Sequence, residues 1–188
     1  MKKSTLLSAS ALATMLAIAS CGSSTQESTD TTTEATVQTE LSLTKVWSTD
    51  TTLRVPESVY YDAKGQILYV SQIDGGPADA DGKGGIAKVG LDGTIVDANW
   101  VTGLHAPKGL GVYDNKLYIA DITDVVVVDI ATGKVTGKYP APGSTFLNDV
   151  TVDANGVVYI SDSSTKKVFR MKDNKVEEYF ESPERPNG

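Results

Sequence analysis

The stretch PKGLGVYDNKLYIAD, at residues 107–121, decides the fold because its pattern occurs three times in the chain. PESVYYDAKGQILYVSQ at residues 56–72 comes before it, and LNDVTVDANGVVYISD at residues 147–162 comes after it. The three starts are 51 and 40 residues apart, and a fourth start, PNG at residues 186–188, lies 39 residues further on. Strand-rich units that repeat about every 40 residues are typical of a β-propeller, in which each unit forms one four-stranded blade. We therefore predict an all-β propeller fold.

Each repeat divides into four short strands separated by turn residues. We expect strands at 59–62, 67–71, 85–90 and 94–101 in the first repeat, at 109–113, 116–120, 125–129 and 135–139 in the second, and at 149–153, 157–161, 167–172 and 175–180 in the third. The run VVVV at 125–128 is too β-branched for anything but a buried strand. The first repeat also carries a Gly- and Asp-rich insertion at 74–84, for which we expect a loop.

The N-terminus resembles the signal peptide of a bacterial lipoprotein. Lys2 and Lys3 precede an apolar run, and small residues lead to Cys21, the single cysteine of the chain. The resemblance implies removal of residues 1–20, acylation of Cys21 and anchoring to a membrane of the cell envelope, with the rest of the chain extracytoplasmic. The alternatives are an ordinary secretory peptide and a membrane-spanning helix, for which the apolar run is too short. Residues 21–43 are rich in Ser and Thr and predict a flexible tether before a propeller domain at 44–188.

The composition argues against nucleic acid as a partner. The chain has 17 Lys and Arg against 24 Asp and Glu, a formal charge of −7 that becomes more negative if the N-terminal signal is removed. No basic patch interleaved with aromatic residues is present in the sequence. A small-molecule substrate is the partner that we expect, with the membrane contacted only through the lipid on Cys21.

Three repeats are too few for a closed ring. Propellers close with four to eight blades, and the fourth start, at 186–188, has no repeat behind it. We therefore expect the sequence to be a fragment that lacks a C-terminal portion. The alternative, a complete three-blade protein, would leave two bare sheet edges.

Four polar residues stand at the same place in successive repeats: Glu57, Lys108, Asn148 and Asn187. Equivalent positions of neighbouring blades surround one axis, so these side chains are predicted to converge on a central channel. The alternative is a purely structural role, in which these residues cap strands or bind structural water. For Asn148 and Asp149, the alternative is a turn closed by an Asx side chain.

Particular residues give the repeats a family resemblance. YIAD at 118–121 and YISD at 159–162 look like NHL-type repeats and like repeats of the SMP-30/gluconolactonase family, and LNDVTVDANG at 147–156 is similar to the Asn-Asp…Asp…Gly segment of the latter. The resemblance implies six blades in the full protein and one divalent cation in the channel. It implies Glu57 and Asn187 as metal ligands, together with an aspartate beyond residue 188. It further implies that Asn148 and Asp149 lie at the catalytic centre.

Carboxylate and amide oxygens are hard ligands that suit Ca²⁺ or Mg²⁺ and are acceptable to Zn²⁺. A cation held by them polarises a carbonyl and lowers the pKa of bound water. The expected function is therefore metal-dependent hydrolysis of a lactone or small ester. Phe146 stands where the family often has a substrate-binding arginine, which favours a more apolar substrate, and Lys108 adds a cation at the channel mouth.

A non-catalytic propeller that binds a sugar, peptide or protein partner is the alternative function, since one fold carries both roles. Asp121 and Asp162 directly follow the expected second strands of their repeats. We expect both to be structural and to fix the loop that follows the second strand.

Overall fold

Twelve β-strands and no helix make up the part of the protein that the structure, a computed structural model, describes, namely residues 42–187. The predicted signal peptide (1–20), the predicted lipidation site Cys21 and all but the last two residues of the predicted tether (21–43) lie outside the described residues. Across 42–187 there is no helix of the length and apolarity that crossing a membrane requires.

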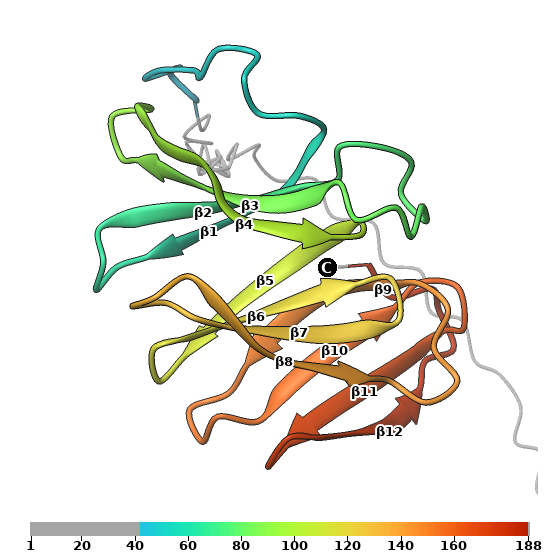
Figure 1. Cartoon of the computed structure of the whole chain (residues 1–188). Helices are drawn as coiled ribbons and strands as arrows, with labels where there is room; N and C mark the ends of the chain where they lie inside the picture. The colour runs from blue at the N-terminus through green and yellow to red at the C-terminus, as the bar shows by residue number, and fades with distance from the viewer. Residues whose placement is uncertain (1–41, 188) are drawn as a thin grey trace, which may run out of the picture. The chain divides into compact units, whose positions relative to one another are not determined.

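The strands form three antiparallel sheets of four, each built from consecutive strands in the order of the chain. Figure 1 shows the three sheets in succession. The first sheet contains β1 (Pro56–Asp62), β2 (Ile67–Gln72), β3 (Gly84–Gly90) and β4 (Ile95–Leu104). The second contains β5 (Pro107–Tyr113), β6 (Lys116–Asp121), β7 (Asp124–Asp129) and β8 (Lys134–Pro140). The third contains β9 (Leu147–Val152), β10 (Val158–Asp162), β11 (Lys167–Lys172) and β12 (Lys175–Glu181).

These sheets confirm the three predicted blades and all twelve predicted strands. The expected bounds differ from the observed ones by at most three residues, and those of β11 are the same. Strands β1, β5 and β9 all begin two or three residues earlier than expected. Each of them begins at the Pro or Leu that opens its repeat, so the candidate site residues lie inside strands and not in the loops before them.

Hairpin turns are placed where the turn residues predict them. Asp114 and Asn115, between β5 and β6, have φ of 45° and 59°, and Asp173 and Asn174, between β11 and β12, have φ of 50° and 61°. Two consecutive residues with positive φ are required in the tight turn whose twist matches that of the strands, and Asn and Asp tolerate this conformation. The sequence therefore fixes these connections locally.

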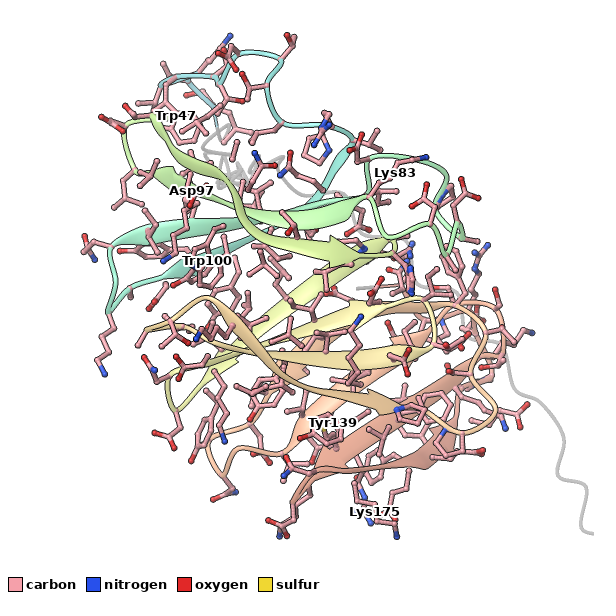
Figure 2. All side chains as sticks on the ribbon, viewed as in Figure 1. Trp47, Lys83, Asp97, Trp100, Tyr139 and Lys175 are labelled. Carbon is pink, nitrogen blue, oxygen red and sulfur yellow. The ribbon has the colours of Figure 1, made fainter. Side chains whose placement is uncertain are left out.

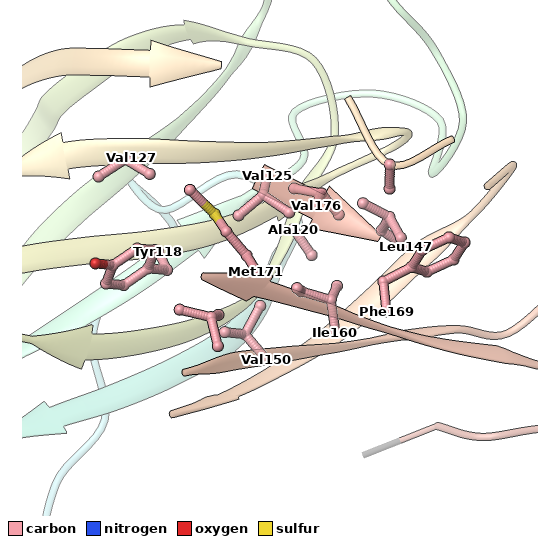
Figure 3. Packing of buried hydrophobic residues seen from close by; sticks show 12 residues of the cluster. Tyr118, Ala120, Val125, Val127, Leu147, Val150, Ile160, Phe169, Met171 and Val176 are labelled. Atoms are coloured by element: carbon pink, nitrogen blue, oxygen red, sulfur yellow. The ribbon is translucent and has the colours of Figure 1, made fainter. Parts of the chain in front are cut away.

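The core lies between neighbouring sheets. In the run 125–128 the side chains alternate: Val125 and Val127 are buried in a cluster shared with the third sheet, and Val126 and Val128 in a cluster shared with the first. Figure 3 shows the former cluster, in which Leu147, Ile160 and Phe169 of the third sheet pack near Val125. Strand β7 is thus buried on both faces of the second sheet, which explains the uninterrupted β-branched run 125–128.

The segment before β1 packs on the first sheet. Trp47 donates a hydrogen bond from Nε1 to the carbonyl oxygen of Leu91 (2.7 Å) and lies against Gly93 in the turn between β3 and β4. Figure 2 shows Trp47 beside that turn. The insertion forms the loop between β2 and β3, as predicted, and Arg54 is joined to its Asp74 by an ion pair of 3.1 Å.

Strand pairing defines two ends for every sheet. At the end that we call the site end, the first strand begins, the second ends and the third begins, as the pairs Pro56–Gln72 and Gln72–Gly85 show. At the other end, which we call the hairpin end, the first and second strands are joined by a turn. The order of strands places Glu57, Lys108 and Asn148 at the site end of their sheets.

Candidate functional site

The candidate residues occupy a β-bulge that recurs in all three sheets. In the second sheet Pro107 pairs with Asp121 and Leu110 with Ile119, so two residues of β5 face the single residue Ala120 of β6. The register of the other two sheets shifts at the same place. The bulged pairs are Glu57 and Ser58 in β1, Lys108 and Gly109 in β5, and Asn148 and Asp149 in β9. A bulge re-aims side chains and is over-represented next to active sites.

A serine hydroxyl on the second strand stabilises two of the bulges. The Oγ of Ser71 accepts a hydrogen bond from the backbone N–H of Ser58 (2.9 Å), and the Oγ of Ser161 accepts one from the N–H of Asp149 (3.0 Å). The bulge removes these N–H groups from the strand ladder, and the hydroxyl replaces the lost acceptor. In the second sheet Ala120 takes the serine position, so this bond is not made there.

Gly109 allows β5 and β9 to approach closely at the bulge. A Cβ atom at Gly109 would overlap the Cα and Oδ1 atoms of Asp149, and one at Gly111 would lie 2.9 Å from a methyl group of Val152. Because Gly109 and Gly111 have no side chains, the backbone of Asp149 lies directly beside β5, the strand that carries Lys108. Figure 1 shows β5 beside β9.

Buried acceptors at the end of each second strand hold the segment that leads into the bulge. The carboxylate of Asp121 accepts hydrogen bonds from the N–H groups of His105 and Ala106 (2.8–3.1 Å). Asp162 accepts from Thr145 (2.7 Å) and Phe146 (3.0 Å) through one oxygen. In the first sheet the Oε1 of Gln72 accepts from the N–H of Arg54 (2.9 Å). Gln72, Asp121 and Asp162, which are equivalent in the three repeats, thus all accept hydrogen bonds from the segment before the first strand of their sheet.

This result corrects one expectation for the two aspartates. Both are structural, as predicted, but Asp121 binds the segment before the first strand and not the loop after the second. Asp162 does both, since its other oxygen accepts from Ser164 (2.9 Å) and Thr165 (2.8 Å). Burial acts to raise the pKa of Asp162, but the four backbone N–H groups outweigh it and hold the pKa below its ordinary value of 3.8.

Glu57 is solvent-accessible, yet its carboxyl group is partly desolvated. Desolvation is the main cause that raises its pKa above 4.5, and the negative charge of Asp149 acts in the same direction. The positive charge of Lys108 opposes both. The charges of Lys108 and Asp149 therefore both act on the Glu57 carboxyl group, although the three residues belong to different sheets. The convergence of Glu57, Lys108, Asn148 and Asn187 on one channel stays a prediction.

Lys108 is almost completely buried, with 2% of its surface exposed. Its Nζ donates a hydrogen bond to the carbonyl oxygen of Ala106 (2.8 Å) and lies 4.4 Å from the centre of the Phe146 ring. Desolvation lowers the pKa of Lys108, while the charges of Asp121 and, to a smaller extent, Glu57 act to raise it. Lys108 therefore carries the positive charge of the site, and Phe146 shields it.

Asn148 and Asp149 are half-buried. The Oδ1 of Asp149 accepts a hydrogen bond from the N–H of the next residue, Val150 (2.8 Å). Together with Pro186, Asp149 lines a small cavity of about 150 Å³. The carbonyl of Pro186 accepts from the Oγ of Ser163 (2.7 Å), which fixes the chain just before Asn187 at the site end of the third sheet. Asn187 itself is exposed, and no described contact joins it to Glu57.

The donor set fits a divalent cation in kind. A partly desolvated carboxylate and amide oxygens are kinds of ligand that Ca²⁺ or Mg²⁺ accepts, and a cation would offset the unfavourable burial of Glu57. Within residues 42–187, however, no group of three or more His, Cys, Asp or Glu side chains is arranged to hold a metal ion. The predicted metal ligands Glu57 and Asn187 are therefore not supported by such a cluster.

The sequence analysis missed Ser71 and Ser161 as supports of the site. Their signal was present, because both serines precede the last residue of the second strand in their repeats. Recognising it required knowledge that the first strand bulges opposite them, and a bulge has no strong signature in a single sequence.

Solved structures with the same fold include three chains. A chain from the crystal structure of a nidogen/laminin complex matches with a TM-score of 0.52 and 21% identity over 70% of this chain and 48% of that chain. A gluconolactonase from Xanthomonas campestris matches with a TM-score of 0.56 and 16% identity over 72% of this chain and 50% of that one. Kuenenia stuttgartiensis hydrazine synthase matches with a TM-score of 0.51 and 14% identity over 68% and 35%, respectively.

No family model matches the chain. A search of curated proteins gives no match either. The chain spans about half the length of the nidogen/laminin and gluconolactonase chains that it resembles. At these identities the similarity concerns the fold, and together with the three four-stranded sheets it confirms the β-propeller fold class predicted from the repeats.

Proposed function

We propose that the site end of the three sheets belongs to a hydrolase that cleaves a lactone or small ester. The observation that carries the proposal is the recurrent bulge, in which Glu57, Lys108 and Asn148 occupy equivalent positions of three sheets. The similarity of fold to a gluconolactonase supports this choice over other hydrolase classes. The proposed setting is the cell envelope, with the chain anchored through Cys21.

Each residue has a role in the proposed reaction. Glu57 and Asn187 would hold a divalent cation, and that ion, when bound, supplies polarisation of the substrate carbonyl and a lowered pKa for water. Asn148 donates a hydrogen bond from its amide to orient the substrate. Asp149 accepts a proton from the attacking water, because its hydrogen bond with Val150 engages Oδ1 and leaves Oδ2 for this purpose.

Lys108 and Phe146 set the substrate class. The Phe146 ring, which is partly exposed, lies over the ammonium group of Lys108 at 4.4 Å. In the proposed site, the ring provides an apolar surface and shields the buried cation. An apolar ring packs against such a surface better than a polyhydroxylated one, whose hydroxyl groups would lose hydrogen bonds to water. We therefore propose an alkyl-substituted lactone in preference to a sugar lactone.

The test is hydrolysis of δ-decalactone and of D-glucono-1,5-lactone by the full-length protein. Activity is measured before and after treatment with EDTA and after addition of Ca²⁺, Mg²⁺ or Zn²⁺. Glu57→Gln is expected to lower kcat/KM by roughly 100-fold or more, since it removes a charge that holds the cation. Glu184→Gln, which changes an exposed glutamate away from the bulges, is the matched control.

Chelator-resistant hydrolysis, or full activity of Glu57→Gln, would overturn the metal assignment. Absence of hydrolysis for both lactones would instead favour the second candidate function, a propeller that binds a protein partner. That candidate is supported by the similarity of fold to a chain of the nidogen/laminin complex. A preference for the sugar lactone would contradict only the roles given to Lys108 and Phe146.

A further inference from the structure

A second recess lies between the second and third sheets at their hairpin end. It has a volume of about 290 Å³ and is lined by the turns β5–β6, β9–β10 and β11–β12. Strand β5 carries Lys108 near one end and Tyr113 at the other, and five residues of extended strand span roughly 17 Å. The recess is therefore separate from the candidate site at the site end. Its size is near the lower limit for a small-molecule pocket, which is about 300 Å³.

The floor of the recess is apolar. It consists of Tyr118, Val158 and Met171, which are 9%, 1% and 3% exposed and belong to the cluster between the two sheets. Figure 3 shows the Tyr118 hydroxyl group directed away from the aliphatic side chains around Val125. No hydrogen bond of this hydroxyl to another described residue is found, and Tyr118 lines the recess, so we take the hydroxyl as one that a ligand can use.

One wall is an aromatic ring held against bare backbone. A Cβ atom at Gly156 would lie 2.5 Å from Cε1 of Tyr113, so the ring of Tyr113 rests on the glycine. Gly156 has φ of +79° in the turn between β9 and β10, a conformation that also favours glycine. The ring thus bridges the two sheets and gives the recess a flat side.

The rim is polar but has no net charge. Asp114 and Asp173 contribute two negative charges, and Lys116 and Lys172 contribute two positive charges, all from exposed side chains. Charges that balance and are screened by solvent give no preference for an anion or a cation.

Hydrogen-bonding groups without charge complete the rim. Asn155, in the turn between β9 and β10, and Asn174, in the turn between β11 and β12, both line the recess. Each amide offers both a donor and an acceptor, which suits adjacent hydroxyl groups of a ligand.

The equivalent tyrosine of the first sheet is covered. Tyr69 has the same place in its repeat as Tyr118, and its ring stacks on Trp100 with the ring centres 4.9 Å apart. The Nζ atom of Lys88 lies 4.1 Å from the centre of the Trp100 ring and covers this position further. Figure 2 shows Trp100 in this position between the first and second sheets. The repeat therefore does not require the tyrosine at this position to be left uncovered, as Tyr118 is.

We propose that this recess binds a neutral saccharide ring. A pyranose has an apolar C–H face, which complements Tyr113 and the floor, and a girdle of hydroxyl groups, which complements the two asparagine amides and the Tyr118 hydroxyl. The balanced rim excludes a ligand that is recognised by its charge. The site acts independently of the hydrolase proposed at the site end.

The experiment is a saturation-transfer NMR titration of the full chain with methyl β-D-glucopyranoside, D-glucosamine and D-glucuronate. We expect the neutral glycoside to bind best. Tyr118→Phe, which keeps the ring, and Asn174→Gly, which suits the φ of +61°, should each weaken binding by roughly fivefold through loss of one hydrogen bond.

Tyr69→Phe and Asn115→Gly are the matched controls, since neither residue lines the recess and Asn115 also has positive φ. Both should leave the affinity unchanged. The proposal is overturned if none of the three sugars gives a signal, or if a charged sugar binds as tightly as the neutral one. It is also overturned if the signal survives in the Tyr118→Phe/Asn174→Gly double variant.

Discussion

Asp162→Ala tests the idea that one buried carboxylate positions the candidate site of the third sheet. Asp162 has no exposed surface and accepts four backbone hydrogen bonds, from Thr145, Phe146, Ser164 and Thr165, at 2.7–3.0 Å. Two of these donors belong to the segment that enters the bulge with Asn148. Alanine leaves all four N–H groups without their acceptor.

The expected loss follows from the number of bonds. A hydrogen bond to a charged group contributes about 1.5–3 kcal/mol, and bonds that share one acceptor are not additive. We therefore expect the free energy of unfolding to fall by about 4 kcal/mol, a large fraction of the stability of a single domain. Asp162→Asn keeps one carbonyl acceptor and should lose about half as much.

The pH dependence has a definite sign. Because the hydrogen bonds hold the folded-state pKa of Asp162 below 3.8, the carboxylate contributes stability that is fully present above pH 3.8. This contribution is lost as the pH falls through the folded-state pKa. The difference in stability between the wild type and Asp162→Asn should therefore shrink below pH 3.8.

Urea unfolding followed by circular dichroism at neutral and acidic pH measures these differences. Asp153→Ala is the matched control, because Asp153 accepts only two backbone hydrogen bonds, from Asn155 (2.8 Å) and Val157 (2.9 Å), in a more exposed turn. We expect it to lose about 1 kcal/mol. Equal losses for the two alanine variants, or a difference from Asp162→Asn that does not change with pH, would refute the reasoning.

Two further changes test the approach of the strands and the buried cation. Gly109→Ala should lower the free energy of unfolding by about 3 kcal/mol, because the new Cβ atom overlaps Asp149. Gly143→Ala is the control: Gly143 has φ of +81° and open space around it, so this change should cost about 1 kcal/mol. Similar losses for the two variants in urea unfolding would contradict the close approach of β5 and β9. Since burial lowers the pKa of Lys108, the folded state disfavours its charged form, and the contribution of Lys108 to the free energy of unfolding should rise with pH toward 10.5. Lys108→Met should lose this rise, and an unchanged pH slope in the variant would argue against a desolvated ammonium group.

Much of the fold could be predicted because its determinants are local. The β-branched run Val125–Val128 predicts a buried strand, and Asp114-Asn115 and Asp173-Asn174 specify their own turns. The repeat register also placed Glu57, Lys108 and Asn148 at equivalent positions, and the recurrent bulge confirms that equivalence. The roles given to these residues stay predictions, as do the metal and the lipid anchor.

The sequence alone therefore determined the three blades found within residues 42–187, their strands and the residues that share one register. Tertiary structure decided what surrounds those residues. Three features depend on contacts between residues that are distant in the chain. Asp121 binds the segment before its sheet, and Ser161 supports a bulge. Tyr118 is open, whereas Tyr69 is covered. Such contacts form only when sheets pack, and pairing by one residue more or less would remove them, so a local pattern does not contain them.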